Sequence, residues 1–404
     1  MRSIKSVAVA GICTLLLSAC FAPAELEAGA VAADKAKLDD TVFAFYLSPQ
    51  SYTWNAGLGS RNPAYVVLVR PDGSYRTIRT RGMDIGQLAW SAEGLYFGDD
   101  ERDYLLHDDG LTTFRNPKPD MQQSAFAVPD GFVAIYNEGV GGPGHYSNQV
   151  AATTRQATKL YPVEGNYFMN ASCDGVVYGI ATDPGAHRVE AADRPDLRSK
   201  TDPTIEPEML ARLYPAGADG REEVLGWRAA FNGGTGIQHA PCAQGVISYL
   251  SAYDDVDGQP RTVVVSWDTA TGAYVEHPLV DEGGRSIPRE DLEFVRYDSG
   301  SLRDGELEWF ASDGRIVATD TATGVTTRRF DTGYRSTASQ FAQVVFTDTS
   351  IHVLYDVNDR RTPLAYGEFD RATGATVRSL TIDGISKHLS THLVMRGMAV
   401  RPRA

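Results

Sequence analysis

The chain of 404 residues lacks several features that mark large protein classes. After residue 17 it has no apolar run long enough to span a membrane as a helix, so the remainder is expected to be soluble. Basic residues are the minority, at 38 against 52 acidic ones, and the net charge is −14. Because nucleic acids are bound largely through counterion release at basic surfaces, we expect no nucleic-acid partner.

Signatures of catalysis and metal binding are also scarce. The eight histidines show no H-E-x-x-H or paired spacing, and no G-x-S-x-G elbow occurs. Acidic loops at 254–258 and 356–359 lack the spacing and distal glutamate of a calcium loop, and solvated turns are commoner. The G-x-G-x-x-G match at 139–144 lies between predicted strands and opens no helix, so we expect a loop there. We therefore expect no metal and no cofactor, while catalysis is neither indicated nor excluded.

The N-terminus has the order of a signal peptide, with two basic residues before an apolar stretch at 7–17. The sequence LSAC, which ends at Cys20, resembles the bacterial lipobox. This resemblance implies removal of residues 1–19, diacylglycerol transfer to the Cys20 thiol and anchoring to the cell membrane, with the protein facing the exterior or the periplasm. An ordinary secretory signal cleaved near residues 22–24 is the alternative, since it has the same order of residue types.

A repeated heptapeptide indicates the architecture. SWDTATG at 266–272 returns as ATDTATG at 318–324 and EFDRATG at 368–374, with the aspartates 52 and 50 residues apart. A β-rich run precedes each copy and another follows it, so each copy is predicted to be a hairpin turn. The Asp side chain accepts hydrogen bonds from backbone N–H groups ahead of it, and Gly takes the positive φ that closes the turn. The spacing fits a four-stranded blade of a β-propeller.

Hairpin signals give the number of blades. Three runs at 41–47, 64–73 and 74–80 lack an innermost partner, and one run at 391–400 lacks a blade. Joining them predicts a blade closed by both termini, which leaves no free sheet edge in the ring. We therefore predict an all-β fold, a seven-bladed propeller of four-stranded antiparallel blades; one misassigned hairpin would make the count six or eight. The other six blades start from inner hairpins at 88–98, 125–136, 170–180, 240–250, 292–310 and 343–355.

The domain organisation follows from these boundaries. Residues 1–19 are the expected signal peptide. Residues 20–40 are rich in Ala and charge and have no β pattern, so they are expected to form a flexible tether. Residues 41–404 are expected to form a single, monomeric propeller domain.

The repeats resemble two propeller families. SWDTATGAYVEHPL resembles the third and fourth strands of a WD repeat, with its Trp-Asp dipeptide in the signature place, although no Gly-His dipeptide precedes the inner strands in register. The segments also resemble the Ala-x-Asp-x-x-Thr-Gly-x-x-x-Trp repeat of pyrroloquinoline-quinone enzymes and their cofactor-free relatives, best at 318–324. The docking tryptophan is replaced by Glu276, Arg328 and Arg378, and no adjacent cysteine pair suggests a quinone site. The resemblance implies a cofactor-free propeller, and it implies fold far more than function.

The four cysteines leave one pair for a disulfide. Cys13 lies in the signal and Cys20 in the lipobox, so Cys173 and Cys242 remain, and export permits oxidation. Both lie near the end of the first strand of consecutive predicted blades, at similar distances from the hairpin glycine. Equivalent positions on neighbouring innermost strands crowd toward the axis, which predicts a Cys173–Cys242 disulfide, with two buried thiols as the alternative.

Loop length is uneven between the two faces of the predicted propeller. The excess falls on second-to-third strand loops and blade-to-blade connections, which share one face, and long loops are commonly functional. We therefore expect binding on this elaborated face, with packing of its aromatic side chains onto the blades as the alternative. The candidate ligand-binding residues are Tyr52, Trp54, His145, Tyr146, Phe231, Asn232, Tyr334 and Arg335. His239 and His392 fall on innermost strands and are candidates to face the channel.

These observations favour an exported, lipid-anchored propeller that acts as a non-catalytic binding module at the cell envelope. Its ligand would be a small molecule, a glycan or an envelope protein. The alternatives are a polysaccharide hydrolase or lyase with its site at the channel mouth, and an envelope assembly scaffold. Convergent titratable groups at the channel mouth would favour an enzyme, whereas an aromatic and amide lining would favour a binding module.

Overall fold

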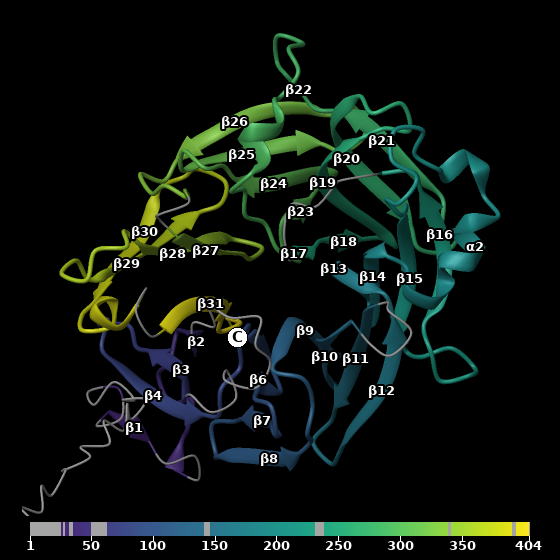
Figure 1. Ribbon diagram of the computed structural model, residues 1–404. Helices are drawn as coiled ribbons and strands as arrows, with labels where there is room; N and C mark the ends of the chain where they lie inside the picture. The colour runs from purple at the N-terminus through teal and green to yellow at the C-terminus, as the bar shows by residue number, and fades with distance from the viewer. Residues whose placement is uncertain are drawn as a thin grey trace, which may run out of the picture.

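The computed structural model describes residues 26, 29–31, 35–49, 63–140, 146–230, 238–337, 341–389 and 393–403. The chain forms a seven-bladed β-propeller whose blades surround a central axis (Figure 1). Each blade contains four antiparallel strands, and three blades have an additional short strand. The predicted fold class is confirmed.

Blade 1 contains strands from both ends of the described chain. From the inside outward its strands are β31 (Leu393–Val400), β2 (Phe43–Pro49), β3 (Ala64–Val69) and β4 (Tyr75–Thr80). β31 pairs antiparallel with β2, from Phe43 opposite Val400 to Pro49 opposite Leu393. This pairing closes the ring, as the sequence predicted.

The other blades follow in chain order, each running from its innermost to its outermost strand. Blade 2 has β5 (Ala89–Ser91), β6 (Gly94–Gly98), β7 (Arg102–Leu106) and β8 (Leu111–Arg115); blade 3 has β9 (Met121–Val128), β10 (Gly131–Val140), β11 (Tyr146–Thr153) and β12 (Thr158–Glu164). Blade 4 has β13 (Asn166–Cys173), β14 (Val176–Asp183), β15 (Glu208–Tyr214) and β16 (Glu223–Arg228); blade 5 has β18 (Cys242–Ala243), β19 (Val246–Asp254), β20 (Pro260–Asp268) and β21 (Tyr274–Pro278). Blade 6 has β23 (Leu302–Arg303), β24 (Glu306–Phe310), β25 (Arg315–Asp320) and β26 (Val325–Asp331), with β22 (Val280–Asp281) at its outer edge; blade 7 has β27 (Phe341–Phe346), β28 (Ser350–Asp356), β29 (Leu364–Asp370) and β30 (Thr376–Ile382).

The repeated heptapeptide forms the turn between the third and fourth strands of blades 5, 6 and 7, as predicted. The Asp268 carboxylate accepts hydrogen bonds from the N–H groups of Ala270 and Thr271, at 2.8 and 2.9 Å. Gly272 has a φ of +67°. The glycine is also constrained from outside its own turn, because a Cβ there would lie 1.8 Å from the carbonyl oxygen of Leu225 in blade 4. The motif therefore closes a hairpin and also packs against the preceding blade.

The described residues of segment 20–40 contact blade 1. β1 (Ala30–Val31) pairs in parallel with the outer strand β4. Leu26 and Leu38 are buried, and the Leu26 carbonyl accepts a hydrogen bond from the Thr77 hydroxyl at 3.0 Å. The apolar residues scattered through this segment thus cover the edge of blade 1, an interaction that a search for β periodicity does not detect.

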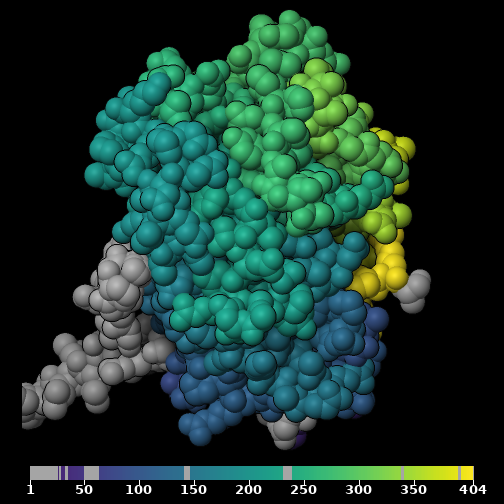
Figure 2. Space-filling view, turned by 90° about the vertical axis from the view of Figure 1, so that its right-hand side faces the viewer, coloured from purple at the N-terminus to yellow at the C-terminus, as the bar shows by residue number. Residues whose placement is uncertain are grey.

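The insertion at 182–207 folds against the outside of the ring. It forms η3 (Gly185–His187), α2 (Arg188–Ala192) and η4 (Pro195–Leu197), in which Ala191 and Leu197 are buried. Further along, the Lys200 N–H donates to the Val256 carbonyl at 2.9 Å, so the insertion contacts a loop of blade 5. Figure 2 shows this side of the molecule. No helix in the described ranges is long and apolar enough to cross a membrane.

Buried charges join neighbouring blades. In blade 4, Arg228 donates to Glu208 at 2.6 Å; this pair reaches blade 5 through Glu276, which accepts from Arg228 at 3.1 Å, and through the Tyr249 hydroxyl, which donates to the same Glu208 oxygen at 2.8 Å. Between blades 6 and 7, Arg371 donates to Glu308 at 2.6 Å. A buried cation is costly unless it is paired, so these contacts fix how the blades face one another.

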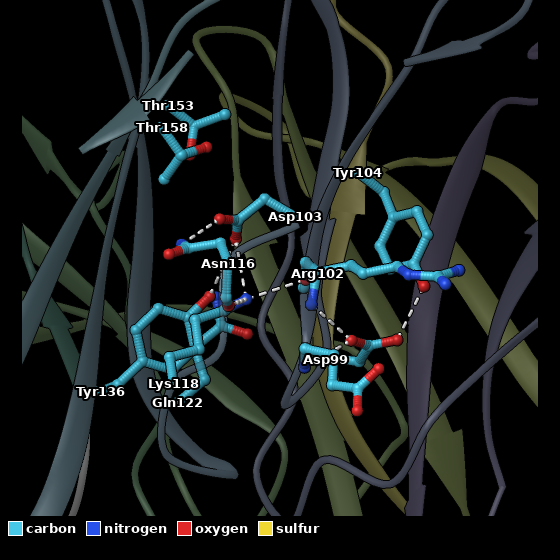
Figure 3. A network of polar contacts seen from close by, with 12 residues as sticks. Asp99, Arg102, Asp103, Tyr104, Asn116, Lys118, Gln122, Tyr136, Thr153 and Thr158 are labelled. Atoms are coloured by element: carbon cyan, nitrogen blue, oxygen red, sulfur yellow. Dashed lines mark hydrogen bonds and ion pairs between the residues drawn. The ribbon is translucent and has the colours of Figure 1, made fainter. Parts of the chain in front are cut away.

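A third buried cation lies between blades 2 and 3 (Figure 3). Lys118 Nζ lies 3.3 Å from Asp103 Oδ1, and neither side chain is exposed. Tyr96 donates its hydroxyl hydrogen to the same carboxylate at 2.6 Å, and its oxygen lies 2.9 Å from the Tyr136 hydroxyl. Burial lowers the pKa of Lys118, and the Asp103 carboxylate opposes that effect. The two tyrosines and the ion pair form a dry polar contact that docks the blades.

A disulfide joins the innermost strands of blades 4 and 5. Cys173 and Cys242 are bonded, with their Cα atoms 5.3 Å apart, within the range that a disulfide requires. Just before it, β17 (Gln238–Ala240) pairs in parallel with β13. Pro241, which has no N–H, separates β17 from β18. The disulfide and the parallel pairing therefore hold two blades together beside the axis.

Candidate ligand-binding site in the central cavity

A cavity of about 670 Å³ lies among the innermost strands. Small-molecule sites usually have volumes of about 300–1,000 Å³, so the cavity has the size of such a site. Polar side chains from six of the seven sheets line it. These residues are Arg396 of blade 1, Gln87 of blade 2, Gln123 of blade 3, Ser172 of blade 4, His239 of β17, which pairs with blade 4, Arg296 of blade 6 and Gln343 of blade 7.

Lining residues lie at different depths of the cavity. Each innermost strand runs toward a short hairpin turn, so lining residues later in the strand lie nearer the short-turn face. Gln87 and Gln343 come early, whereas Trp90, Ala127 and Val345 come within a few residues of the turns. Two glutamines therefore lie toward the elaborated face, and these three apolar residues lie toward the short turns.

The walls also differ around the ring. Arg296 and Arg396 come from blades 6 and 1, so they flank Gln343 of blade 7. On other blades, the ring of Phe126 lies 4.9 Å from the ring of His239, centroid to centroid. Burial lowers the pKa of His239 to about 4, so its imidazole is neutral at physiological pH. One wall thus carries positive charge, and another carries uncharged rings.

Blade 6 departs from the sequence-based assignment. The run 292–297 was predicted to be the first strand of its inner hairpin, but the structure has η5 (Arg289–Leu292) at its start. In that run Arg296 alone bridges to the next strand, through paired backbone hydrogen bonds of 2.9 and 2.8 Å with Phe310. The paired strand resumes only at β23.

A turn that contains Asp298 explains this irregular strand. The Asp298 carboxylate accepts hydrogen bonds from the N–H groups of Gly300 at 2.9 Å and Phe346 at 3.2 Å. Gly300 packs so close to the next blade that a Cβ would lie 2.0 Å from the Phe346 carbonyl oxygen. Burial raises the pKa of Asp298 to about 7. Within the described lining, Asp298 is the single carboxyl group.

The residues predicted to bind ligand on the elaborated face are only partly described. Tyr334 packs on Tyr355 and Phe369, at centroid distances of 5.1 and 6.2 Å, which is the packing alternative. Tyr146 begins β11, and neither it nor Arg335 lines the central cavity. Binding by this set stays a prediction. Outside the described residues lie Tyr52, Trp54, His145, Phe231, Asn232, His392 and the predicted lipidation site Cys20.

In the two acidic loops considered as calcium sites, aspartate carboxylates accept hydrogen bonds from residues of the same loop or next to it. Asp255 accepts hydrogen bonds from the N–H groups of Asp257 and Gln259 and from the Arg261 guanidinium. Asp356 accepts one from the Asn358 N–H at 2.9 Å. In the part of the chain that the structure describes, no group of three or more His, Cys, Asp or Glu side chains is arranged to hold a metal.

The sequence contains a feature that could have predicted the positions of the two cavity arginines. Arg296 and Arg396 each stand in an otherwise largely apolar run, LEFVRY and THLVMRGMAV, assigned to innermost strands. A charged residue in such a strand has few places to point except the axis. The same reasoning selected His239, which does line the cavity.

Comparisons with known proteins support the propeller fold. A family description, the YycP beta-propeller domain, matches residues 36–192, which is less than half of the chain. No curated protein matches the chain. A mutant of the Synechocystis apocarotenoid oxygenase is 12% identical with a TM-score of 0.48, over 90% of this chain and 94% of the oxygenase. Apo AztD from Citrobacter koseri is 9% identical with a TM-score of 0.43, over 89% of this chain and 98% of AztD. At these values neither structure adds an argument about function.

Proposed function

We propose that the protein is a non-catalytic binding module that takes a small-molecule ligand into its central cavity. The observation that carries this proposal is the lining, in which three glutamines and four aromatic residues surround a cavity of about 670 Å³. Amides orient a ligand through hydrogen bonds, and rings supply apolar contact area. These residues are Gln87, Gln123, Gln343, Trp90, Phe126, Tyr297 and Phe346.

The lining supports binding over glycan cleavage. Hydrolysis of a glycosidic bond by the usual mechanism needs two carboxyl groups. The described lining holds one, Asp298, and its oxygens accept hydrogen bonds from the backbone N–H groups of Gly300 and Phe346. A polysaccharide hydrolase or lyase would therefore need a second group from outside the described lining.

Filling the cavity is the test of this proposal. The full chain and its Gln343→Trp variant are incubated with a mixture of aromatic acids, amino acids and oligosaccharides, and retained compounds are identified by mass spectrometry after ultrafiltration. We expect Gln343→Trp to lose the compounds that the unmodified chain retains, because the indole occupies their space. Gln156→Trp, in an exposed turn, is the matched control and should retain them.

Three results would contradict the binding proposal. Retention that is equal in the unmodified chain and Gln343→Trp would place binding elsewhere, including on the loops of the elaborated face. Cleaved oligosaccharides that appear only with the unmodified chain would establish the hydrolase or lyase instead. If no small molecule is retained by any variant, the assembly-scaffold alternative becomes the better explanation.

We further propose that the module is exported and lipid-anchored through Cys20, on the strength of the LSAC sequence. Cys20→Ser should move the protein from the membrane fraction to the soluble fraction of a native host and abolish its labelling by a fatty-acid analogue. Cys13→Ser, within the same signal, should leave both unchanged. Membrane fractionation and acyl labelling that survive in Cys20→Ser would show the lipobox interpretation to be wrong.

A further inference from the structure

The two arginines that line the cavity are partly buried, and they differ from the fully buried arginines of the chain. Arg228 pairs with Glu208 and Glu276, and Arg371 pairs with Glu308. Arg296 and Arg396 form no ion pair with any carboxylate of the described ranges. The chain thus neutralises its fully buried guanidinium groups between the blades, whereas two partly buried ones at the cavity have no ion-pair partner among the described residues.

The contacts of these two arginines are sparse. Arg296 donates to the backbone carbonyls of Val295 at 2.9 Å and Ala342 at 3.4 Å, which orient it but do not balance its charge. The buried Nε atom of Arg396 has no hydrogen-bond partner among the described residues. Burial lowers the pKa of both guanidinium groups, and Asp84 opposes this for Arg396 without reaching ion-pair distance. A protein of net charge −14 therefore concentrates positive charge at its axis.

We propose that the cavity binds an aromatic carboxylate, with its carboxylate group at the wall formed by Arg296 and Arg396. This assignment rests on the proposed function and names the class of ligand for the same site. Guanidinium groups hold carboxylates through strong charge-assisted hydrogen bonds, often in pairs. Gln343, between the two arginines in the ring, can donate to the same group.

The other lining residues account for the aromatic part of the ligand. Phe126 and the neutral His239 ring offer apolar faces, and Trp90 lines the end of the cavity toward the short turns. A flat ring fits beside such side chains through stacked or edge contacts. A second carboxylate would be disfavoured there, since no cation lines this side in the described residues.

One buried acceptor specifies a further feature of the ligand. Gln123 is 1% exposed and lines the cavity, and its Oε1 atom has no hydrogen-bond partner among the described residues. A buried acceptor without a donor is costly, so a ligand that donates a hydrogen bond here gains affinity. Gln123 is on β9 of blade 3, on another side of the ring from the wall formed by Arg296 and Arg396, so the donor would lie at the end of the ligand away from its carboxylate. A hydroxyl on the aromatic ring meets this requirement.

Calorimetric titration with 4-hydroxybenzoate tests the assignment, with 4-hydroxybenzamide as the neutral isostere. We expect Arg296→Gln and Arg396→Gln each to bind 4-hydroxybenzoate about tenfold to a hundredfold more weakly than the unmodified chain. Binding of 4-hydroxybenzamide should be weak, and neither substitution should change it. Arg328→Gln, which alters an arginine that is 57% exposed on the outer strand of blade 6, is the matched control and should bind as the unmodified chain does.

The outcomes separate this assignment from the proposed function. If 4-hydroxybenzamide binds as tightly as 4-hydroxybenzoate, or if both arginine variants bind 4-hydroxybenzoate normally, the anion assignment fails while cavity binding stands. If 4-hydroxybenzoate does not bind, the aromatic carboxylate assignment fails. The proposed function is then decided independently, by whether the unmodified chain retains compounds that Gln343→Trp does not.

Thermal unfolding without any ligand gives a second, independent measurement. A partly buried arginine without a counter-charge destabilises the ligand-free protein. Arg396→Met should therefore raise the midpoint of thermal unfolding by about 1–3 °C. Arg371→Met removes an arginine that is paired with Glu308 and should lower that midpoint. If Arg396→Met lowers the midpoint as much as Arg371→Met does, Arg396 has a structural role and the assignment is overturned.

Discussion

Replacing Arg228 with leucine is expected to lower the free energy of unfolding by about 3–5 kcal/mol. Arg228 is 1% exposed; it neutralises the equally buried Glu208 of its own blade 4 and also pairs with Glu276 of blade 5. Its guanidinium also lies 4.4 Å from the centre of the Tyr253 ring. The substitution leaves the Glu208 carboxylate without a counter-charge and removes the cation–π contact. Urea unfolding followed by tryptophan fluorescence measures the loss.

A surface arginine on the same blade provides the comparison. Arg212 pairs with Glu223, and both side chains are substantially exposed, at 34% and 48%. Arg212→Leu should cost less than about 1 kcal/mol, because exposed ion pairs are screened by water and salt. If Arg228→Leu and Arg212→Leu have equal unfolding midpoints, the buried pair does not hold blades 4 and 5 together.

Loss of the Cys173–Cys242 disulfide is expected to have an effect of similar size. The bond closes a loop across a sequence separation of 69 residues, for which the chain-entropy estimate is about 4 kcal/mol. The parallel pairing of β13 with β17 remains when the bond is broken, so the innermost strands keep part of their contact. Calorimetric unfolding of the double variant Cys173→Ser/Cys242→Ser should show a lower midpoint than that of the oxidised chain.

Reduction of the unmodified chain is the control for this effect. A phosphine reductant should lower the midpoint of the unmodified chain to that of the double variant, and it should leave the double variant unchanged. The same midpoint for the oxidised chain, the reduced chain and the double variant would mean that the bond does not contribute to stability.

The sequence was informative where one local rule repeats. The turn at Asp268 needs only a carboxylate, two N–H groups and a glycine with positive φ, all within seven residues. The local sequence is therefore sufficient to predict it. Three copies gave the spacing of the blades. The unpaired runs at the two ends gave the closure through β2 and β31, because a ring cannot leave strands without partners.

Contacts between blades could not be predicted in this way. Arg228 ends an outer strand, where a surface arginine is the ordinary expectation, and its partner in the next blade, Glu276, is 48 residues later. Only the packing of two blades shows that Arg228 is buried. The turn at Asp298 has a similar cause, since it depends on the Phe346 backbone 48 residues away. Such features depend on long-range geometry, which a single sequence does not record.

The closure of blade 1 also sets an order of events for the folding chain. β2 and β31 lie at opposite ends of the described chain, so their pairing has one of the largest loop-closure costs in the molecule. During synthesis from the N-terminus, β2 must wait for β31 while six other blades are made. We therefore expect closure of the ring to be the last step of folding. Until β31 has been synthesised, the inner edge of β2 should stay unpaired.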